Sequence, residues 1–345
     1  MRIEVKALPV HDIVKDIARQ WKVPIQEDSG ELTIEIPQSI GEGMIRSADF
    51  DSGIGVIVYK GTFYEDYDIL FTINETHPLK FIFCSEGTAD HAFEEDKETH
   101  TIHTYQNVIV SSSGNNGHML SFKANQPAHI TSLEIIRHTF SNRNNHHFHG
   151  LEPELKALFE DSVAEKKFFY QGNYSLRAAD LVEEIDSQEY KGFVRNLFLE
   201  GKLFDMLVIQ INQYQDDRRE DNQPQIMRRF DVEKVDRASR LIQENLNENY
   251  SVEYLAQEVG TNVNKLQQGF KHTYDLTVNK YNQRIKLEKA RELLESSEYN
   301  ISEIVNMIGL SNRSYFAKIF KEKYGVSPKY FLKSYAEVED DASDE

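Results

Sequence analysis

Residues 251–331 contain the same helical pattern twice, and this repeat constrains the fold more than any other feature of the chain. In each copy an amphipathic stretch ends at a glycine, Gly260 or Gly309, and a second amphipathic stretch follows. Glycine adopts the left-handed conformation that lets a helix end in a sharp turn. The pattern therefore predicts two helix-turn-helix units.

Capping and apolar residues predict where these helices begin and which side they bury. Ser251 is a good N-cap, Asn300 with Glu303 forms a capping box, and Ser311 is expected to cap the last helix. The predicted buried faces consist of Leu255, Ala256, Val259, Leu266 and Phe270 in the first copy and Ile304, Val305, Ile308, Phe316 and Phe320 in the second. Each pair of helices should pack through this apolar side.

The second helix of each copy presents amide and cationic side chains on its polar face, and such groups hydrogen-bond base edges and phosphates. The candidate DNA-binding residues are Asn264, Lys265, Gln267, Gln268, Lys271, Arg313, Ser314, Lys318 and Lys321. Asn264, Gln267 and Gln268 are predicted to read bases. In the second copy, Arg313 should read a base, with Lys318 and Lys321 at the backbone or a groove edge. The alternative, a helical bundle with a solvated basic face, is disfavoured by the repetition.

A third helical pattern, residues 277–294, separates the two copies. At about 1.5 Å per residue it spans roughly 27 Å. Successive major-groove faces lie about 34 Å apart along DNA, so one chain is predicted to contact two adjacent turns.

Four segments of this region resemble the AraC/XylS family of bacterial transcription regulators. They are residues 283–294, 301–305, 309–316 and 324–330. Leu310 stands where the family usually has Phe, and Asp275 where it usually has Gly. Leucine still fills an apolar pocket, and aspartate tolerates a left-handed conformation. The resemblance implies a DNA-binding regulator of promoters, such as an activator, with RNA polymerase as a partner.

The length and cysteine content favour an intracellular protein of several domains. A chain of 345 residues predicts two or three domains. The only cysteine, Cys84, excludes an internal disulfide and agrees with a reducing compartment. No apolar window approaches the roughly 20 residues that cross a bilayer. A cytoplasmic location without a membrane partner is therefore expected.

The net charge of −18 is unevenly distributed. Residues 231–335 carry 16 Lys and Arg against 14 Asp and Glu, so the acidity lies elsewhere. An acidic body should suppress non-specific DNA binding, which depends on phosphate neutralisation. Residues 336–345 are acidic and lack aromatic side chains, which predicts a disordered tail.

Between about residues 31 and 139 the hydrophobic period is two, which is typical of β-strands. The predicted strands are residues 32–37, 55–59, 68–73, 79–84, 108–111, 119–123 and 130–136, and residues 114–117 form a hairpin signal. This pattern predicts an antiparallel sandwich or barrel. The family resemblance implies a cupin-like barrel that binds an effector. The expected fold class is therefore α+β.

From residue 152 to residue 217 the pattern is helical. Its apolar positions are Leu155, Leu158, Phe159, Phe193, Leu197, Phe204, Val208 and Ile211. Residues 192–207 resemble the helix that precedes the DNA-binding domain in the siderophore-responsive, PchR-like branch of the family. Whether residues 193–211 form core or a dimer contact stays open. We expect domains at 1–150 (β-rich, effector-binding), 151–217 (helical, dimerisation) and 231–335 (DNA-binding), with a linker at 218–230.

Ten of the twelve histidines lie between His77 and His149, which raises the question of a metal site. They lack the carboxylate spacing of a cupin metal site. We therefore expect surface or hydrogen-bonded core histidines, with neither a bound metal nor another cofactor. His146, His147 and His149 are expected in a loop between domains.

The sequence favours a homodimeric, ligand-responsive transcription regulator rather than an enzyme, because no Ser/His/Asp or phosphate-loop motif supports catalysis. Its effector, a siderophore or a sugar, and the effector-binding residues stay open, as do the operator and the choice between activation and repression. One alternative is a metal-dependent cupin-type enzyme fused to a DNA-targeting module, which needs three or four His/Glu ligands. Another is an interaction protein whose helix-turn-helix units serve only as a scaffold.

Overall fold

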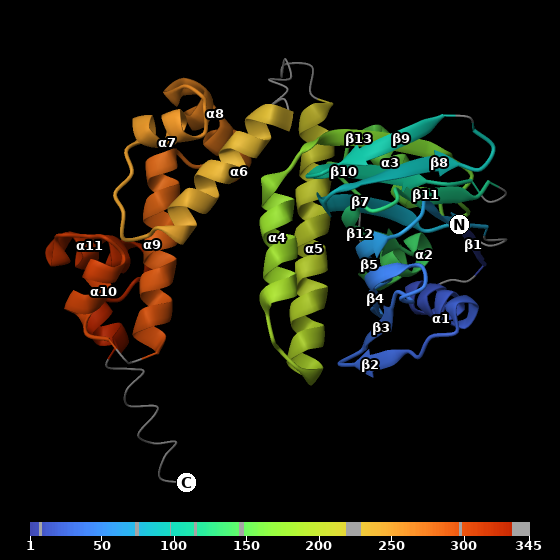
Figure 1. The fold of residues 1–345 in the computed structure, drawn as a ribbon, viewed down its shortest axis with the longest axis horizontal. Coiled ribbons are helices and arrows are strands. Elements are labelled where there is room, and N and C mark those ends of the chain that lie inside the picture. The colour runs from blue at the N-terminus through green and yellow to red at the C-terminus, as the bar shows by residue number, and fades with distance from the viewer. Residues whose placement is uncertain are drawn as a thin grey trace, which may run out of the picture. The chain divides into compact units, whose positions relative to one another are not determined.

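The computed structural model describes residues 1–6, 9–72, 76–96, 98–113, 116–144, 148–218, 229–296 and 299–332 (Figure 1). The chain divides into an N-terminal unit, Met1–Ile226, and a C-terminal unit, Met227–Glu345. Residues 114 and 115 of the predicted hairpin turn, His146, His147, most of the linker and the acidic tail lie outside the described residues. Among the described helices, none is long and apolar enough to cross a membrane.

The N-terminal unit is built on two β-sheets. The smaller sheet has the order β1-β6-β11-β8-β9 and consists of Arg2–Val5 (β1), Tyr67–Phe71 (β6), His118–Phe122 (β11), Thr88–Phe93 (β8) and Thr99–His103 (β9). The larger sheet has the order β13-β10-β7-β12-β5-β4-β3-β2 and consists of Phe168–Tyr174 (β13), Gln106–Ser111 (β10), Leu79–Glu86 (β7), Pro127–Ile135 (β12), Ile54–Phe63 (β5), Gly41–Asp49 (β4), Glu31–Glu35 (β3) and Gln26–Asp28 (β2). The pair β1 and β6 is parallel, whereas β10 pairs with both of its neighbours in antiparallel register. The β-rich region that the sequence predicts is therefore confirmed.

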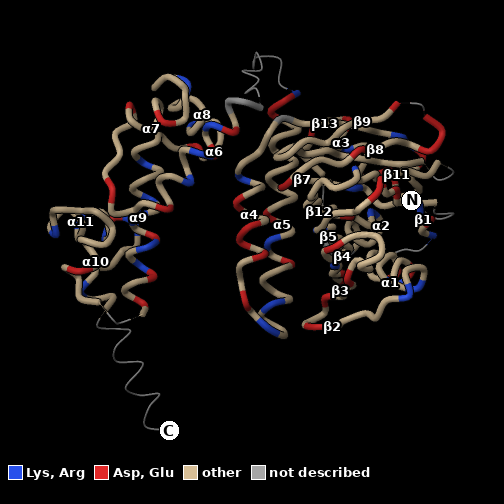
Figure 2. The backbone as a smooth tube through the Cα atoms, in the orientation of Figure 1, with Lys and Arg blue, Asp and Glu red and all other residues tan. Residues whose placement is uncertain are grey.

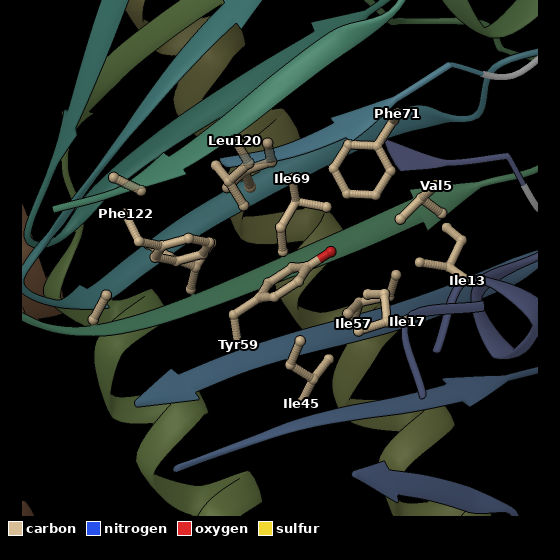
Figure 3. Packing of buried hydrophobic residues seen from close by; sticks show 14 of the residues in the cluster. Val5, Ile13, Ile17, Ile45, Ile57, Tyr59, Ile69, Phe71, Leu120 and Phe122 are labelled. Carbon is tan, nitrogen blue, oxygen red and sulfur yellow. The ribbon is translucent and has the colours of Figure 1, made fainter. Parts of the chain in front are cut away.

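The larger sheet buries both of its faces, as the alternation along β7 illustrates. Ile82 and Cys84 belong to a first core that includes residues of the smaller sheet, and Phe81 and Phe83 belong to a second core. Figure 3 shows part of the first core, where Tyr59 lies among side chains of both sheets. The helix Val10–Trp21 (α1) packs against this first core.

Four helices follow the strand β12 among the described residues of the N-terminal unit. They are Arg137–Asn144 (α2), Pro153–Glu160 (α3), Leu176–Ser187 (α4) and Gly192–Asp217 (α5). Residues of α3, α4 and α5 fill the second core, including Leu155, Leu158 and Phe159. The helical prediction for residues 152–217 is wrong for Phe168–Tyr174, because these residues form β13, which pairs with β10. Its aromatic run Phe168-Phe169-Tyr170 favours a strand.

Helix α5 is apolar on two sides. Leu199, Leu203 and Met206 are buried against the second core. Phe193, Leu197 and Val208 lie on another side and are 79%, 60% and 57% exposed. This part of the predicted apolar stripe is therefore not core of the described chain.

The C-terminal unit is helical. Its helices are Arg229–Glu244 (α6), Val252–Glu258 (α7), Val263–Tyr274 (α8), Val278–Glu295 (α9), Ile301–Met307 (α10) and Arg313–Tyr324 (α11). Ser251 caps α7, and Asn300 with Glu303 forms the predicted capping box of α10. Ser311 is not the cap of α11, because the side chain of Asn312 accepts the hydrogen bond from Tyr315 N. Asparagine at position 312 places its oxygen three residues before that amide, which is the usual N-cap spacing.

Candidate nucleic-acid interface

The helices of the C-terminal unit form two packed pairs on either end of α9 (Figure 1). In α7 and α8, Leu255, Leu266 and Phe270 are buried. In α10 and α11, the corresponding cluster of buried residues includes Ile304, Phe316 and Phe320 together with Leu287 of α9. Gly260 and Gly309 end the leading helices with φ of +68° and +66°, as the sequence predicts. Burial of these apolar sides leaves the polar side of α8 and of α11 facing outward.

The three side chains of α8 that are predicted to read bases differ in how exposed they are. Asn264 and Gln268 are exposed, as is the neighbouring Lys265. Gln267 is half-buried, and its Oε1 accepts a hydrogen bond of 3.2 Å from the backbone N–H of Val278 at the start of α9. This hydrogen bond connects α8 to the start of α9, a contact that sequence reasoning missed.

Lys271, near the end of α8, forms an ion pair with Asp275, the residue at which the helix ends. Its Nζ lies 2.6 Å from Oδ1 of Asp275 and also donates to the carbonyl oxygen of Asp275. Both side chains are exposed, so this ion pair is weak and can exchange for a phosphate contact. Asp275 has a left-handed backbone with φ of 55°, as expected from its place in the turn.

On α11, Arg313 occupies the first helical position, and Ser314, Lys318 and Lys321 are exposed with it. Arg313, Lys318 and Lys321 form no ion pair with any carboxylate of the described residues. The N-terminus of a helix, with its unpaired N–H groups, is itself favourable for phosphate. The predicted cations of α11 are therefore available to a polyanion.

The basic residues of α9 differ from those of α11, because several of them form ion pairs with acidic residues of the same helix. Figure 2 shows acidic and basic residues interspersed along this helix. Lys289 lies 2.8 Å from Glu292, and Arg291 lies 3.2 Å from Glu295. This contrast distinguishes the cations of α11 from an ordinary solvated helix face.

A polar cluster around the buried Lys286 joins the two helix pairs. Lys286 of α9 is buried, and its Nζ donates to Oδ1 of Asn249 at 2.9 Å and to the carbonyl oxygen of Glu248 at 3.3 Å. Asn249 in turn donates from Nδ2 to the carbonyl oxygen of Gly309 at 2.8 Å. Burial lowers the pKa of Lys286. Sequence reasoning missed this cluster, although Lys286 lies four residues before the buried Ala290 and therefore on the buried face.

The predicted histidine-rich region contains buried imidazoles that lack hydrogen bonds. Both ring nitrogens of His77, His91 and His118 have no partner within the described parts of the chain, so the expectation of hydrogen-bonded core histidines is wrong for these three. Burial is the main reason that the pKa of His77 falls to about 4 and that of His91 to about 3. Among the described residues, no three His, Cys, Asp or Glu side chains are placed to hold a metal ion.

Comparison with known proteins identifies both units. A family model described as the regulatory protein PchR N-terminal domain matches residues 40–226, more than half of the chain. A model described as a helix-turn-helix domain matches residues 255–334.

Individual relatives match mainly a part of the chain. Histidine kinase P4 of Formosa agariphila is 31% identical over 109 residues, which cover 31% of this chain and 8% of the relative. Transcriptional activator AggR of Escherichia coli is 31% identical over 97 residues, which cover 28% of this chain and 36% of the relative. The C-terminal domain of AraT, a response regulator from Geobacillus stearothermophilus, is 29% identical with a TM-score of 0.28, covering 29% of this chain and 84% of that chain.

The match to these two curated relatives spans less than half of their length. The two family models, in contrast, together cover most of both units of the chain. The chain therefore belongs to the PchR-like branch of the AraC/XylS family of transcription regulators.

Proposed function

We propose that this protein binds promoter DNA through two helix-turn-helix units, α7 with α8 and α10 with α11, and recruits RNA polymerase there. The observation that carries the proposal is the pair of outward polar faces on α8 and α11, which are held on one scaffold by α9 and the Lys286 cluster. A helix of this kind fits the major groove, and α9 separates the two pairs by about one helical turn of DNA.

The individual side chains suggest different roles in this interface. Asn264 and Gln268 would read bases from α8, since an exposed amide can bond adenine through two hydrogen bonds. Arg313 would read a guanine, while Lys318 and Lys321 anchor the phosphate backbone. Lys265, Lys271 and Ser314 would add backbone contacts. Gln267 would act mainly by orienting α8, given its hydrogen bond to Val278.

The test is binding of the full chain to sites selected from a random pool of DNA duplexes. Gln268→Ala should weaken binding to the selected site by about 1 to 3 kcal/mol and relax the preference at one base pair. Lys321→Ala should weaken binding to all sequences alike and lower the slope of log K against log salt by roughly one. Lys289→Ala, which alters a paired cation of α9, is the control and should bind normally. Unchanged affinity, slope and preference in both test variants would contradict the proposed interface.

The N-terminal unit is the proposed effector-binding part, with its two sheets forming a cupin-like barrel. Its match to the PchR model supports a role in regulation. The family also supports a small-molecule effector, for which a siderophore or a sugar are candidates.

We further propose that two copies of the chain pair through α5. In an antiparallel arrangement, Phe193 of one copy would face Val208 of the other, and Leu197 would face Phe204. Both pairs are centred on the same point, next to Gly201, so the exposed stripe is complementary to itself about a two-fold axis. A Cβ atom at Gly201 would meet nothing within 4 Å. Glycine inside a helix costs roughly 1 kcal/mol relative to alanine, and a close helix crossing offers a reason for it.

A further inference from the structure

A cleft of about 580 Å³ lies between α2 and α3, outside both sheets. Its lining includes Arg137 and His138 of α2, Phe148, and Lys156, Phe159 and Glu160 of α3. This volume is within the range of pockets that bind small organic molecules. We infer that the cleft binds a small monocarboxylate with a flat aromatic body, and that this ligand is the effector of the function proposed above.

Arg137 supplies the charge for a carboxylate. Its guanidinium donates to the carbonyl oxygen of His77 at 2.8 Å and to the hydroxyl oxygen of Ser111, which are both neutral. The residue is only 2% exposed, and its Nε has no hydrogen-bond partner among the described residues. Burial lowers its pKa to about 10, while the charge of Asp161 acts in the opposite direction. A buried cation with an unused donor is stabilised by an anion in contact with it.

The cleft also offers an apolar surface for the flat body of the ligand. Two stacked aromatic rings form this surface. The ring centroids of Phe148 and Phe159 lie 5.1 Å apart with an interplanar angle of 26°. Phe159 is buried in the second core, whereas Phe148 is half-buried at the cleft. A planar ligand can stack on such rings and gain stability beyond the area that it buries.

The remaining charges of the cleft favour a single negative charge on the ligand. Lys156 is half-buried and Glu160 is exposed, and their charged groups lie 3.6 Å apart. Glu160 offsets the charge of Lys156 and would repel a dianion such as a phosphate. Arg137 then remains the principal attraction, which matches one carboxylate.

The cleft is connected by packing to the helix that we propose as the dimer contact. The ring of Phe159 lies 6.0 Å from that of Phe140, and Phe140 lies 6.2 Å from Phe204 of α5. Phe204 belongs to the stripe proposed to pair in the dimer. A ligand stacked on Phe159 therefore acts on the same aromatic cluster that supports α5.

The inference can be tested by calorimetric titration of the full chain with 2-naphthoate, compared with the neutral 2-naphthamide. We expect saturable binding of 2-naphthoate and at least tenfold weaker binding of the amide. Arg137→Gln should weaken 2-naphthoate binding at least tenfold, because it removes a charge-assisted contact. Lys15→Gln, which alters an exposed cation of α1, should bind like the unmodified chain.

Arg137→Gln also removes two internal hydrogen bonds, so a second pair of variants keeps the inference testable if that protein does not fold. Phe148→Ala should weaken 2-naphthoate binding several-fold by removing the stacking surface, and Glu160→Gln should strengthen it. Equal binding of acid and amide, no saturable binding, or affinities unaffected by all three cleft variants would overturn the assignment.

The same experiments separate this inference from the proposed function. If Gln268→Ala and Lys321→Ala weaken DNA binding as expected but 2-naphthoate does not bind, the cleft assignment alone fails. If 2-naphthoate binds as described while the DNA-binding variants behave like the unmodified chain, the cleft stands as a ligand site and the proposed DNA interface fails.

Discussion

Nζ of Lys286 lies 2.9 Å from Oδ1 of Asn249, and through this contact the central helix α9 holds the segment that precedes α7. Nδ2 of Asn249 in turn donates a hydrogen bond to the carbonyl oxygen of Gly309, which lies in the turn between α10 and α11. The three residues thus link parts of the C-terminal unit that contact different stretches of the proposed DNA site.

We therefore expect Asn249→Ala to destabilise the C-terminal unit by about 1 to 3 kcal/mol, because it leaves the buried Lys286 ammonium short of an acceptor. Affinity for a DNA site that occupies both helix pairs should fall more than affinity for a half-site. Hydrogen exchange of α9 and a binding titration with both duplexes measure these effects. Asn264→Ala is a suitable control, since this exposed asparagine should alter DNA binding without changing exchange in α9. Unchanged exchange in Asn249→Ala would contradict the role of the cluster.

The two turn glycines should respond differently to alanine. Both have positive φ, so alanine at Gly260 should cost roughly 1 to 2 kcal/mol from backbone strain alone. A Cβ at Gly309 would also lie 2.3 Å from the carbonyl oxygen of Asn247, whereas one at Gly260 meets nothing within 4 Å. We expect Gly309→Ala to cost a further 1 to 3 kcal/mol, roughly the penalty of overpacking. Hydrogen exchange of α10 and of α7 checks this difference, and equal costs would show that the turn at Gly309 relaxes freely.

Acidification should destabilise the N-terminal unit already at pH values above those at which carboxylates titrate. Burial lowers the pKa of His77 to about 4 and of His91 to about 3, and it holds that of His118 well below 6.5. The unfolded chain takes up these protons near pH 6.5, but the folded chain does not. Stability is therefore fully present above pH 6.5 and is lost as the pH falls toward 4, by up to about 1.4 kcal/mol per pH unit for each histidine.

Urea unfolding at pH 7.5 and 5.5, followed by the fluorescence of the single tryptophan, Trp21, measures this loss. His91→Phe should lose less stability than the unmodified chain, because its aromatic replacement cannot take up a proton. The ring of His91 already lies 5.0 Å from Phe93 and 5.3 Å from Phe169, so phenylalanine fits the surroundings chemically. The same pH dependence in both proteins would mean that His91 is protonated in the fold.

The proposed dimer contact through α5 can be tested by introducing opposite charges at two positions that face each other across it. Phe193→Lys and Val208→Glu should each yield folded monomers, because each places a charge in an apolar contact. An equimolar mixture of the two should associate, since an antiparallel pair brings the introduced lysine of one copy to the introduced glutamate of the other. Sedimentation velocity measures both states. Lys15→Glu, which reverses an exposed charge of α1, is the control and should remain dimeric. A monomeric unmodified chain would refute the dimer itself, and dimers in both single variants would place the contact elsewhere.

The sequence predicts the C-terminal helices well because their determinants are local. Ser251, Asn300 and Gly260 act within a few residues of their own backbone, and each is found in the predicted role. Asn312 is the exception, since two adjacent polar residues offer alternative caps and only the backbone geometry decides between them.

Non-local features are less predictable. The strand β13 depends on β10, which lies far earlier in the chain, so the helical pattern around it gives no sign of the pairing. Gln267 resembles a base-reading residue because its spacing on α8 is right, but its hydrogen bond to Val278 requires the actual angle between two helices. The cleft beside Arg137 likewise combines α2 and α3 with residues such as His77, which no local pattern relates.

The 18 residues of α9 correspond to about five complete turns at 3.6 residues per turn. Inserting one residue would rotate everything beyond it by about 100° around the helix axis, which would turn α11 away from the direction set by α8. Loss of one residue would rotate it by the same amount in the opposite sense. Among homologous genes, we therefore expect insertions and deletions to be excluded from this helix even where its surface residues vary freely.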